Sequence, residues 1–259
     1  MNNNYSFEKT PYVLSNQGID PIKKLESGVK LKSKISNIMI SSAIKQGGYK
    51  VVQDNPLKLK DDRPVIYIAN HTRFQDGPVM RTQITNETYL LVGTQKLRRI
   101  DKLFFNATVT MYVDRSSKED KKYAKEFIIK MLDRGHSFAC FPEVTWNLTL
   151  DQLMMPMKWG YIIEAKEADA QIIPMVFVYD INTKECHVTH LEPIVFSNQK
   201  VDLNEENERI RNEMGQVILN HPSFVGLGEA KKRIIPNILN EYPYYEFDKE
   251  QSYVLKKNK

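Results

Sequence analysis

The sequence predicts an α/β protein with a mainly parallel central sheet flanked by helices and a helical N-terminal segment. Through the middle of the chain, short apolar runs rich in β-branched residues alternate with segments of helical periodicity. That alternation is typical of a parallel sheet covered by helices. The chain has 259 residues, 41% of them hydrophobic, which suits one large domain with a substantial core.

The first fifty residues divide into two parts. Residues 1–20 are polar and show no period, so we expect a loop. Residues 21–50 hold seven lysines against a single acid, Glu26, and their apolar residues fall roughly at helical spacing. A basic amphipathic helix of this kind either lies on an anionic membrane surface or packs on the protein with a solvated lysine face. Both interpretations remain open.

The following elements alternate along the chain. The expected strands cover residues 49–53, 65–69, 88–93, 109–113, 137–141, 171–179 and 187–196. The expected helices cover residues 76–84, 96–105, 118–132 and 160–168, with a last one around residues 210–218 that ends before Pro222.

Two of these elements carry specific local signals. Ser116 and Glu119 have the spacing of a capping box ahead of the clearest helix, and Gly135 follows as its expected C′ residue. Pro174 interrupts an otherwise apolar strand, which favours an edge strand or a bulge. We divide the chain into an N-terminal segment (1–50), an α/β domain (51–225) and a basic, aromatic C-terminal tail (226–259) packed on that domain.

Composition excludes several classes of function. The sequence has a net charge of +5, too modest for a nucleic-acid role, and lacks an apolar signal-peptide core and any run long enough to span a membrane. Its two cysteines and five histidines lack metal-ligand spacing, so we expect no metal and a reduced, cytoplasmic environment. Any membrane attachment is expected to be peripheral, on the inner face of the membrane.

The most informative stretch runs from Val65 to Asp76. A buried strand, Val65 to Ala69, delivers Asn70, His71 and Asp76 to a strand-to-helix turn, the place where open α/β sheets bind ligands. A neutral imidazole there can take a proton from an attacking hydroxyl, while a carboxylate fixes its tautomer. Alternatively, His71 caps the following helix and Asp76 complements its dipole.

Two further strands end in similar polar groups. Asp114 and Arg115 follow one strand, and Glu143 and Thr145 follow another. In a parallel sheet these loops share one edge with His71 and Asp76. An arginine offers a donor fork for phosphate or carboxylate, and the glutamate and threonine can bond substrate hydroxyls.

In their order and spacing these residues resemble the glycerolipid acyltransferases typified by lysophosphatidic acid acyltransferase. The resemblance covers roughly residues 50–195. The matching motifs are Asn70-His71 with Asp76, Tyr112-Val113-Asp114-Arg115, Phe141-Pro142-Glu143-Val144-Thr145-Trp146, and the proline-containing strand 172–176, with Lys158 and Gly160 following the third motif in the family's manner.

The resemblance implies transfer of a fatty acyl group from acyl-CoA or acyl carrier protein to a hydroxyl, in phospholipid biosynthesis and without a cofactor. It makes His71 the general base and Asp76 its partner. It implies acceptor binding by a further set of residues: Asn70, Asp114, Arg115, Glu143, Thr145, Trp146 and Lys158. We also expect backbone N–H groups at the start of the helix after Asn70 to stabilise the oxyanion.

The chain departs from the family where Val144 and Trp146 replace a glycine and an arginine. If that arginine holds a phosphate, the acceptor here is a different one, such as a sugar or polyol. Trp146 would then stack on it, line the acyl groove or simply pack. Two other functions remain open: a non-catalytic protein that binds lipid or membrane on the same fold, and a thioesterase that uses the same histidine and aspartate on water.

Overall fold

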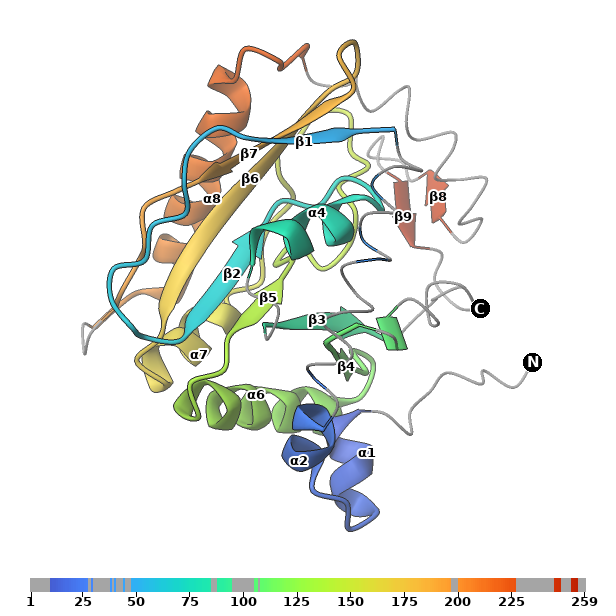
Figure 1. Ribbon diagram of the computed structural model, residues 1–259, viewed down its shortest axis with the longest axis vertical. Coiled ribbons are helices and arrows are strands. Elements are labelled where there is room, and N and C mark those ends of the chain that lie inside the picture. Colours follow the sequence, from blue (N-terminus) through green and yellow to red (C-terminus); the bar gives the residue numbers. More distant parts are fainter. Residues whose placement is uncertain are drawn as a thin grey trace.

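A seven-stranded sheet lies at the centre of the molecule, in the strand order β1-β7-β6-β2-β5-β3-β4 (Figure 1). The computed structural model describes residues 10–27, 29, 38, 40, 44, 48–84, 88–94, 105–106, 108–196, 200–226, 245–247 and 253–255. The strands of the sheet are β1 (Lys50–Gln53), β2 (Val65–Ala69), β3 (Tyr89–Gly93), β4 (Thr110–Val113), β5 (Phe138–Cys140), β6 (Gln171–Asp180) and β7 (Glu185–His190). The helices are α1 (Pro11–Asn16), α2 (Pro21–Glu26), α4 (Asp76–Gln83), α6 (Lys118–Asp133), α7 (Gly160–Glu167) and α8 (Leu203–Asn220).

The sheet is mainly parallel, as the sequence predicts. Strands β6, β2, β5, β3 and β4 run in one direction, whereas β7 pairs antiparallel with β6 and β1 pairs parallel with β7. The carboxyl ends of β2, β4 and β5 therefore share one edge, and β1 runs in the opposite direction on the far side of β7.

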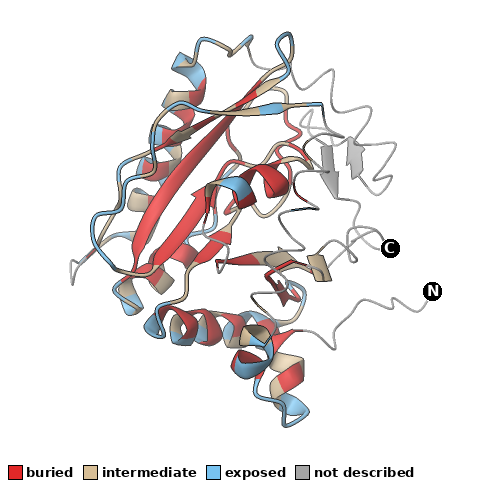
Figure 2. Ribbon diagram, in the orientation of Figure 1, coloured by how far each residue is buried: buried red, intermediate tan, exposed pale blue. Residues whose placement is uncertain are grey.

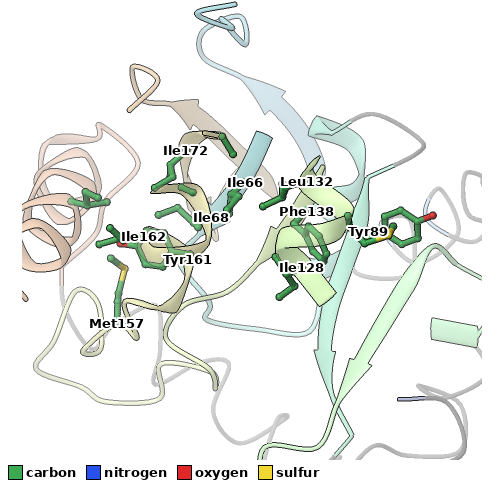
Figure 3. Close-up of a cluster of buried hydrophobic side chains, with 14 of the residues drawn as sticks. Ile66, Ile68, Tyr89, Ile128, Leu132, Phe138, Met157, Tyr161, Ile162 and Ile172 are labelled. Atoms are coloured by element: carbon green, nitrogen blue, oxygen red, sulfur yellow. The ribbon is translucent and has the colours of Figure 1, made fainter. Parts of the chain in front are cut away.

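Both faces of the sheet are covered, which explains why β2 is buried along its whole length (Figure 2). Ile66 and Ile68 pack in a core with side chains of α6, α7 and α8 (Figure 3). The alternate residues Val65 and Tyr67 pack with Val79 of α4 on the other face. This two-sided burial fixes the register of β2 and hence the position of the residues that follow it.

Of the two residues predicted to mark the ends of helix α6, one is confirmed. Gly135 follows the helix with φ 82°, the left-handed conformation expected of a C′ glycine. The predicted cap at Ser116 is wrong by one residue, because Ser117 is the N-cap and its hydroxyl accepts the N–H of Asp120 at 3.0 Å. Ser116 instead donates its hydroxyl to Asp114 at 2.6 Å.

Of the two positions predicted for Pro174, the edge is wrong and the bulge is confirmed. Strand β6 lies between β7 and β2, and Pro174 is paired with Ile68 of β2. On its other side Met175 pairs with His190 whereas Ile172 pairs with Ile194, so two residues of β6 face three residues of the neighbouring segment. The missing N–H of the proline therefore falls at the break between these two pairings, where the ladder loses little.

The N-terminal residues contain more helix than expected. The predicted loop is wrong for residues 11–16, because α1 begins after Thr10, whose hydroxyl accepts the N–H of Val13. Helix α2 begins after Asp20 in the same way, and both helices have proline at their first position, a favourable start. Most of the predicted basic helix beyond α2 and most of the helix predicted at 96–105 lie outside the described residues.

The C-terminal tail is described only at β8 (Tyr245–Phe247) and β9 (Tyr253–Leu255), which form an antiparallel pair. The division into three segments stays a prediction. Among the described helices, none combines the length and apolarity needed to cross a bilayer.

Candidate active site

The predicted histidine and aspartate meet at the carboxyl edge of the sheet. His71 follows β2, and Asp76 begins α4. Nδ1 of His71 lies 3.0 Å from Oδ2 of Asp76. Asp76 is fully buried, whereas 18% of the His71 side chain is exposed. The pair therefore joins an inaccessible carboxylate to an imidazole that solutes can reach.

Asp76 accepts hydrogen bonds from several donors. Oδ2 accepts the backbone N–H groups of Thr72 at 2.5 Å and Arg73 at 2.8 Å, and Oδ1 accepts the hydroxyl of Tyr179 at 2.7 Å. Because three donors already point at this carboxylate, it acts as the acceptor toward His71. Nδ1 of His71 then carries the proton, and Nε2 is left with a lone pair that can accept a proton from a substrate.

Two aromatic side chains fix the imidazole ring. Phe141 stacks on its face, with ring centroids 4.0 Å apart and an interplanar angle of 13°. Trp146 approaches edge-on, with centroids 5.9 Å apart at 65°. Trp146 is 9% exposed and lies against the candidate base. Its position favours packing on His71 over the stacking and groove-lining roles considered above.

Glu143 holds the backbone of the same histidine. Its Oε1 accepts the N–H of His71 at 2.7 Å, and its Oε2 accepts the N–H of Met155 at 2.6 Å. The side chain is 1% exposed, so its carboxylate ties two loops together instead of facing solvent. The N–H groups of residues 71–73 point at Glu143 and Asp76, so an oxyanion needs donors other than these three.

Asn70 also has a structural position. Its side-chain nitrogen donates to the carbonyl of Phe177 at 3.0 Å, and its side-chain oxygen accepts the N–H of Phe177 at 2.7 Å. With an exposed fraction of 2%, the amide extends the pairing of β2 with β6 by one residue. It anchors the strand end that presents His71.

The loop of Asp114 and Arg115 contacts the loop of Glu143 and Thr145. Asp114 is buried and accepts both the N–H and the hydroxyl of Ser116, which shapes the turn after β4. The neighbouring Arg115 is exposed, and its guanidinium donates to the carbonyl of Val144. Arg115 is therefore the cation that the structure brings to the loop of Glu143.

The third loop has an unusual backbone. Val144 has φ 60°, a left-handed conformation that is unfavourable for a β-branched residue and natural for the glycine found there in the family. Thr145 beside it is half-buried. Lys158 donates its backbone N–H to the carbonyl of Pro142 at 2.9 Å while its side chain is exposed, so it supports this loop through its backbone.

Three residues near the pair were missed by sequence reasoning. The guanidinium carbon of Arg73 lies 3.7 Å from the ring centroid of Tyr179 and 5.3 Å from that of Tyr49. Arg73 also donates to the hydroxyl of Tyr49 at 2.9 Å and is 3% exposed. Burial, together with the charge of Asp76, raises the pKa of Tyr179 well above its ordinary value, so its hydroxyl remains a donor.

Asn147 was also missed, although it organises the loop beyond Trp146. It is fully buried, and its side-chain nitrogen donates to the carbonyls of Gln152 and Leu153, both at 3.1 Å. Its backbone N–H donates to the carbonyl of His71 at 2.6 Å. A polar residue inside an apolar stretch was the available signal.

Comparison with known proteins gives a family and a fold. A family model described as Acyltransferase matches residues 50–178. The crystal structure of the 1-acyl-sn-glycerophosphate (LPA) acyltransferase PlsC from Thermotoga maritima is similar, with a TM-score of 0.55 and 17% identity over 76% of this chain and 80% of that chain. At this identity the likeness shows the fold. A search of curated proteins gave no match.

Proposed function

The chain belongs to the glycerolipid acyltransferase family and is an O-acyltransferase, and from that premise we propose its donor, acceptor and mechanism. It moves a fatty acyl group from acyl-CoA or acyl carrier protein to a hydroxyl of a lysophospholipid or a related polyol or sugar. The observation that carries this mechanism is the 3.0 Å contact between Nδ1 of His71 and Asp76, which leaves Nε2 as the base.

The reaction proceeds without a covalent acyl-enzyme. Nε2 of His71 takes the proton of the acceptor hydroxyl while its oxygen attacks the thioester carbonyl. Asp76 stabilises the imidazolium, which then gives the proton to the departing thiolate as the tetrahedral intermediate collapses. The stacked ring of Phe141 keeps the imidazole in the plane that this transfer needs.

The acceptor site lacks one cation of the family pattern. Trp146 stands where the family has arginine and packs on His71. Arg115 is exposed beside Val144, whereas Arg73 is buried between two tyrosines. An acceptor site with one arginine depends less on a phosphate group of the acceptor than a site with the two arginines of the family pattern. Uncharged polyols or sugars are therefore acceptors.

We further propose peripheral contact with an anionic membrane. The exposed side chains of helix α6 include Lys121, Lys122 and Lys130 as well as Glu119, Glu126 and Asp133, while Lys125 is paired with Glu167 at 2.6 Å. Exposed lysines are attracted by anionic headgroups. Flotation with anionic and neutral liposomes tests this contact, and indifference to both would remove it.

The mechanism is tested by His71→Ala, with His136→Gln as a control at a histidine that pairs with Glu26. We expect His71→Ala to fold and to lose about 10²–10⁴-fold in turnover, with the control unchanged. The assay follows thiol release from acyl-CoA with phosphorylated and unphosphorylated acceptors. Full turnover by His71→Ala would refute the mechanism, and equal thiol release without acceptor would identify a thioesterase.

A further inference from the structure

A second cluster of ionisable side chains lies on the outer strands β1 and β7 of the sheet, away from His71. Asp54 follows β1, His187 lies in β7, and His221 follows the last residue of α8. One potential ligand atom from each residue lies within 4.8 Å of the other two. These residues come from three distant parts of the sequence, and the second and third lie beyond the matched region 50–178.

The two imidazoles converge on one carboxylate. Nδ1 of His187 lies 2.9 Å from Oδ1 of Asp54, and Nε2 of His221 lies 3.2 Å from Oδ2. The two rings are 4.7 Å apart between centroids. Two nitrogens and one carboxylate oxygen therefore face a common point without any rearrangement of the backbone.

Neighbouring groups suit a metal site. Oε2 of Glu185 lies 3.7 Å from Nε2 of His187, and Thr189 donates its hydroxyl to Asp54 at 3.0 Å. Metal-binding histidines commonly present their second nitrogen to a carboxylate, as His187 does here.

The cluster is also accessible. The side chains are 27% exposed for Asp54, 17% for His187 and 11% for His221, and they line an open surface pocket with Gln216 and Asn220 of α8. A metal entering from this pocket would meet the three ligands on one side and water on the other. Among the described residues, no other group of three histidine, cysteine or acidic side chains meets the same spacing.

We propose that Asp54, His187 and His221 form a zinc site that fastens the end of α8 to strands β1 and β7. Two imidazoles and a carboxylate are a ligand set that Zn²⁺ favours, with water in the fourth position. When zinc binds, each neutral imidazole keeps its single proton, which passes from the nitrogen that now faces Asp54 to the other ring nitrogen. In His187 it passes to Nε2, beside Glu185, and in His221 to Nδ1, which ends the bond that this atom accepts from the N–H of Ser223.

The site lies outside the acyl-transfer machinery and acts on stability. Its ligands are 133 and 167 positions apart, so the site exists only in the folded chain, and zinc stabilises the protein by binding that state alone. Its role is to hold α8, which covers one face of β6, in place. Zinc binding is independent of which substrate the enzyme uses.

The test uses the full chain, stripped with a chelator and titrated with Zn²⁺ against a competing chromophoric indicator. We expect one zinc per chain, a dissociation constant in the micromolar range or below, and a higher thermal midpoint with zinc. Asp54→Asn, His187→Gln and His221→Gln should each abolish binding and the thermal shift. Thr189→Val should weaken binding by about 10–100-fold, the usual effect of removing a supporting group.

Two controls separate this site from adventitious binding. His136→Gln removes a histidine with a single carboxylate partner, and His71→Ala removes the candidate base; both should bind zinc as the wild type does. Circular dichroism without metal establishes that each variant is folded. Absence of zinc binding by the folded wild type, or binding that survives in His187→Gln and His221→Gln, would overturn the proposal.

Discussion

Tyr179 of β6 donates its hydroxyl to Oδ1 of Asp76 at 2.7 Å, across 103 positions of the sequence. Asp76 uses its other oxygen for His71, so the tyrosine and the histidine hold opposite sides of one carboxylate. The orientation of the base is therefore set by a strand in the middle of the sheet as well as by its own loop.

We predict that Tyr179→Phe lowers both stability and turnover. The substitution leaves a buried carboxylate oxygen without its donor, which costs about 1–3 kcal/mol of unfolding free energy. Turnover should fall more than KM changes, because the orientation of His71 is lost and substrate contacts are not. Urea denaturation and steady-state kinetics measure the two effects. Tyr67→Phe, at a buried tyrosine of β2 that does not bond to Asp76, is the matched control.

We predict that Glu143→Gln destabilises the chain and slows the reaction. The glutamine amide presents one oxygen and one NH₂ group, so one of the N–H groups of His71 and Met155 faces another donor. The free energy of unfolding should fall by about 2 kcal/mol or more, which is the usual cost of an unpaired buried donor. Thermal unfolding and kcat are the measurements. A variant with both values unchanged would mean that the carboxylate does not brace this loop.

We predict that Val144→Gly raises stability. Valine at φ 60° is strained, and glycine removes that strain while keeping the bond from this N–H to the carbonyl of Phe141. The free energy of unfolding should rise by about 1 kcal/mol, once the entropy that glycine adds to the unfolded chain has been subtracted. The reverse change, Gly135→Ala at φ 82°, should lose a similar amount. A lower urea midpoint for Val144→Gly would contradict the prediction.

We predict that Glu164 makes stability fall as pH rises from about 4.5 to about 7. Burial raises its pKa to about 7, with the charge of Glu167 adding to the rise and Lys125 opposing it. Because the folded state holds this proton more tightly than the unfolded state, folding is favoured below the window and loses that contribution across it.

Glu164→Gln should remove this pH dependence and stabilise the chain at pH 8 by about 1–2 kcal/mol, less than the full shift because the residue is only half-buried. Denaturant midpoints at pH 5 and pH 8 give the slope. Glu167→Gln, at an exposed position of the same helix, should keep most of the wild-type slope.

The sequence was most informative where one rule decides the outcome. The run Val65–Ala69 is apolar on both faces, so it predicted a buried parallel strand and placed His71 at its end. Pro174 correctly predicted a bulge, but its strand is not at the edge of the sheet, because the order of the strands depends on pairings that no local pattern reveals. Likewise Thr10 and Pro11 mark a helix start, but the helix they begin is too short to show a period.

The candidate site was predictable in its chemistry and not in its internal contacts. Motif spacing identified His71 and Asp76, whereas Tyr179 and Arg73 depend on the pairing of β6 with β2. For the same reason Glu143 and Asn70 were assigned to substrate, although their bonds go to the backbone of this protein. The cluster of Asp54, His187 and His221, for which we propose zinc, was not found from the sequence because its members are separated by 133 and 167 positions.

Strand β6 supplies both the partner of Asn70 and the hydroxyl that holds Asp76, although it is synthesised about a hundred positions after them. A growing polypeptide thus carries the base and its carboxylate long before the groups that orient them leave the ribosome. Recovery of turnover during refolding should therefore lag behind compaction of the chain and coincide with docking of β6. The return of activity would then report the last stage of folding.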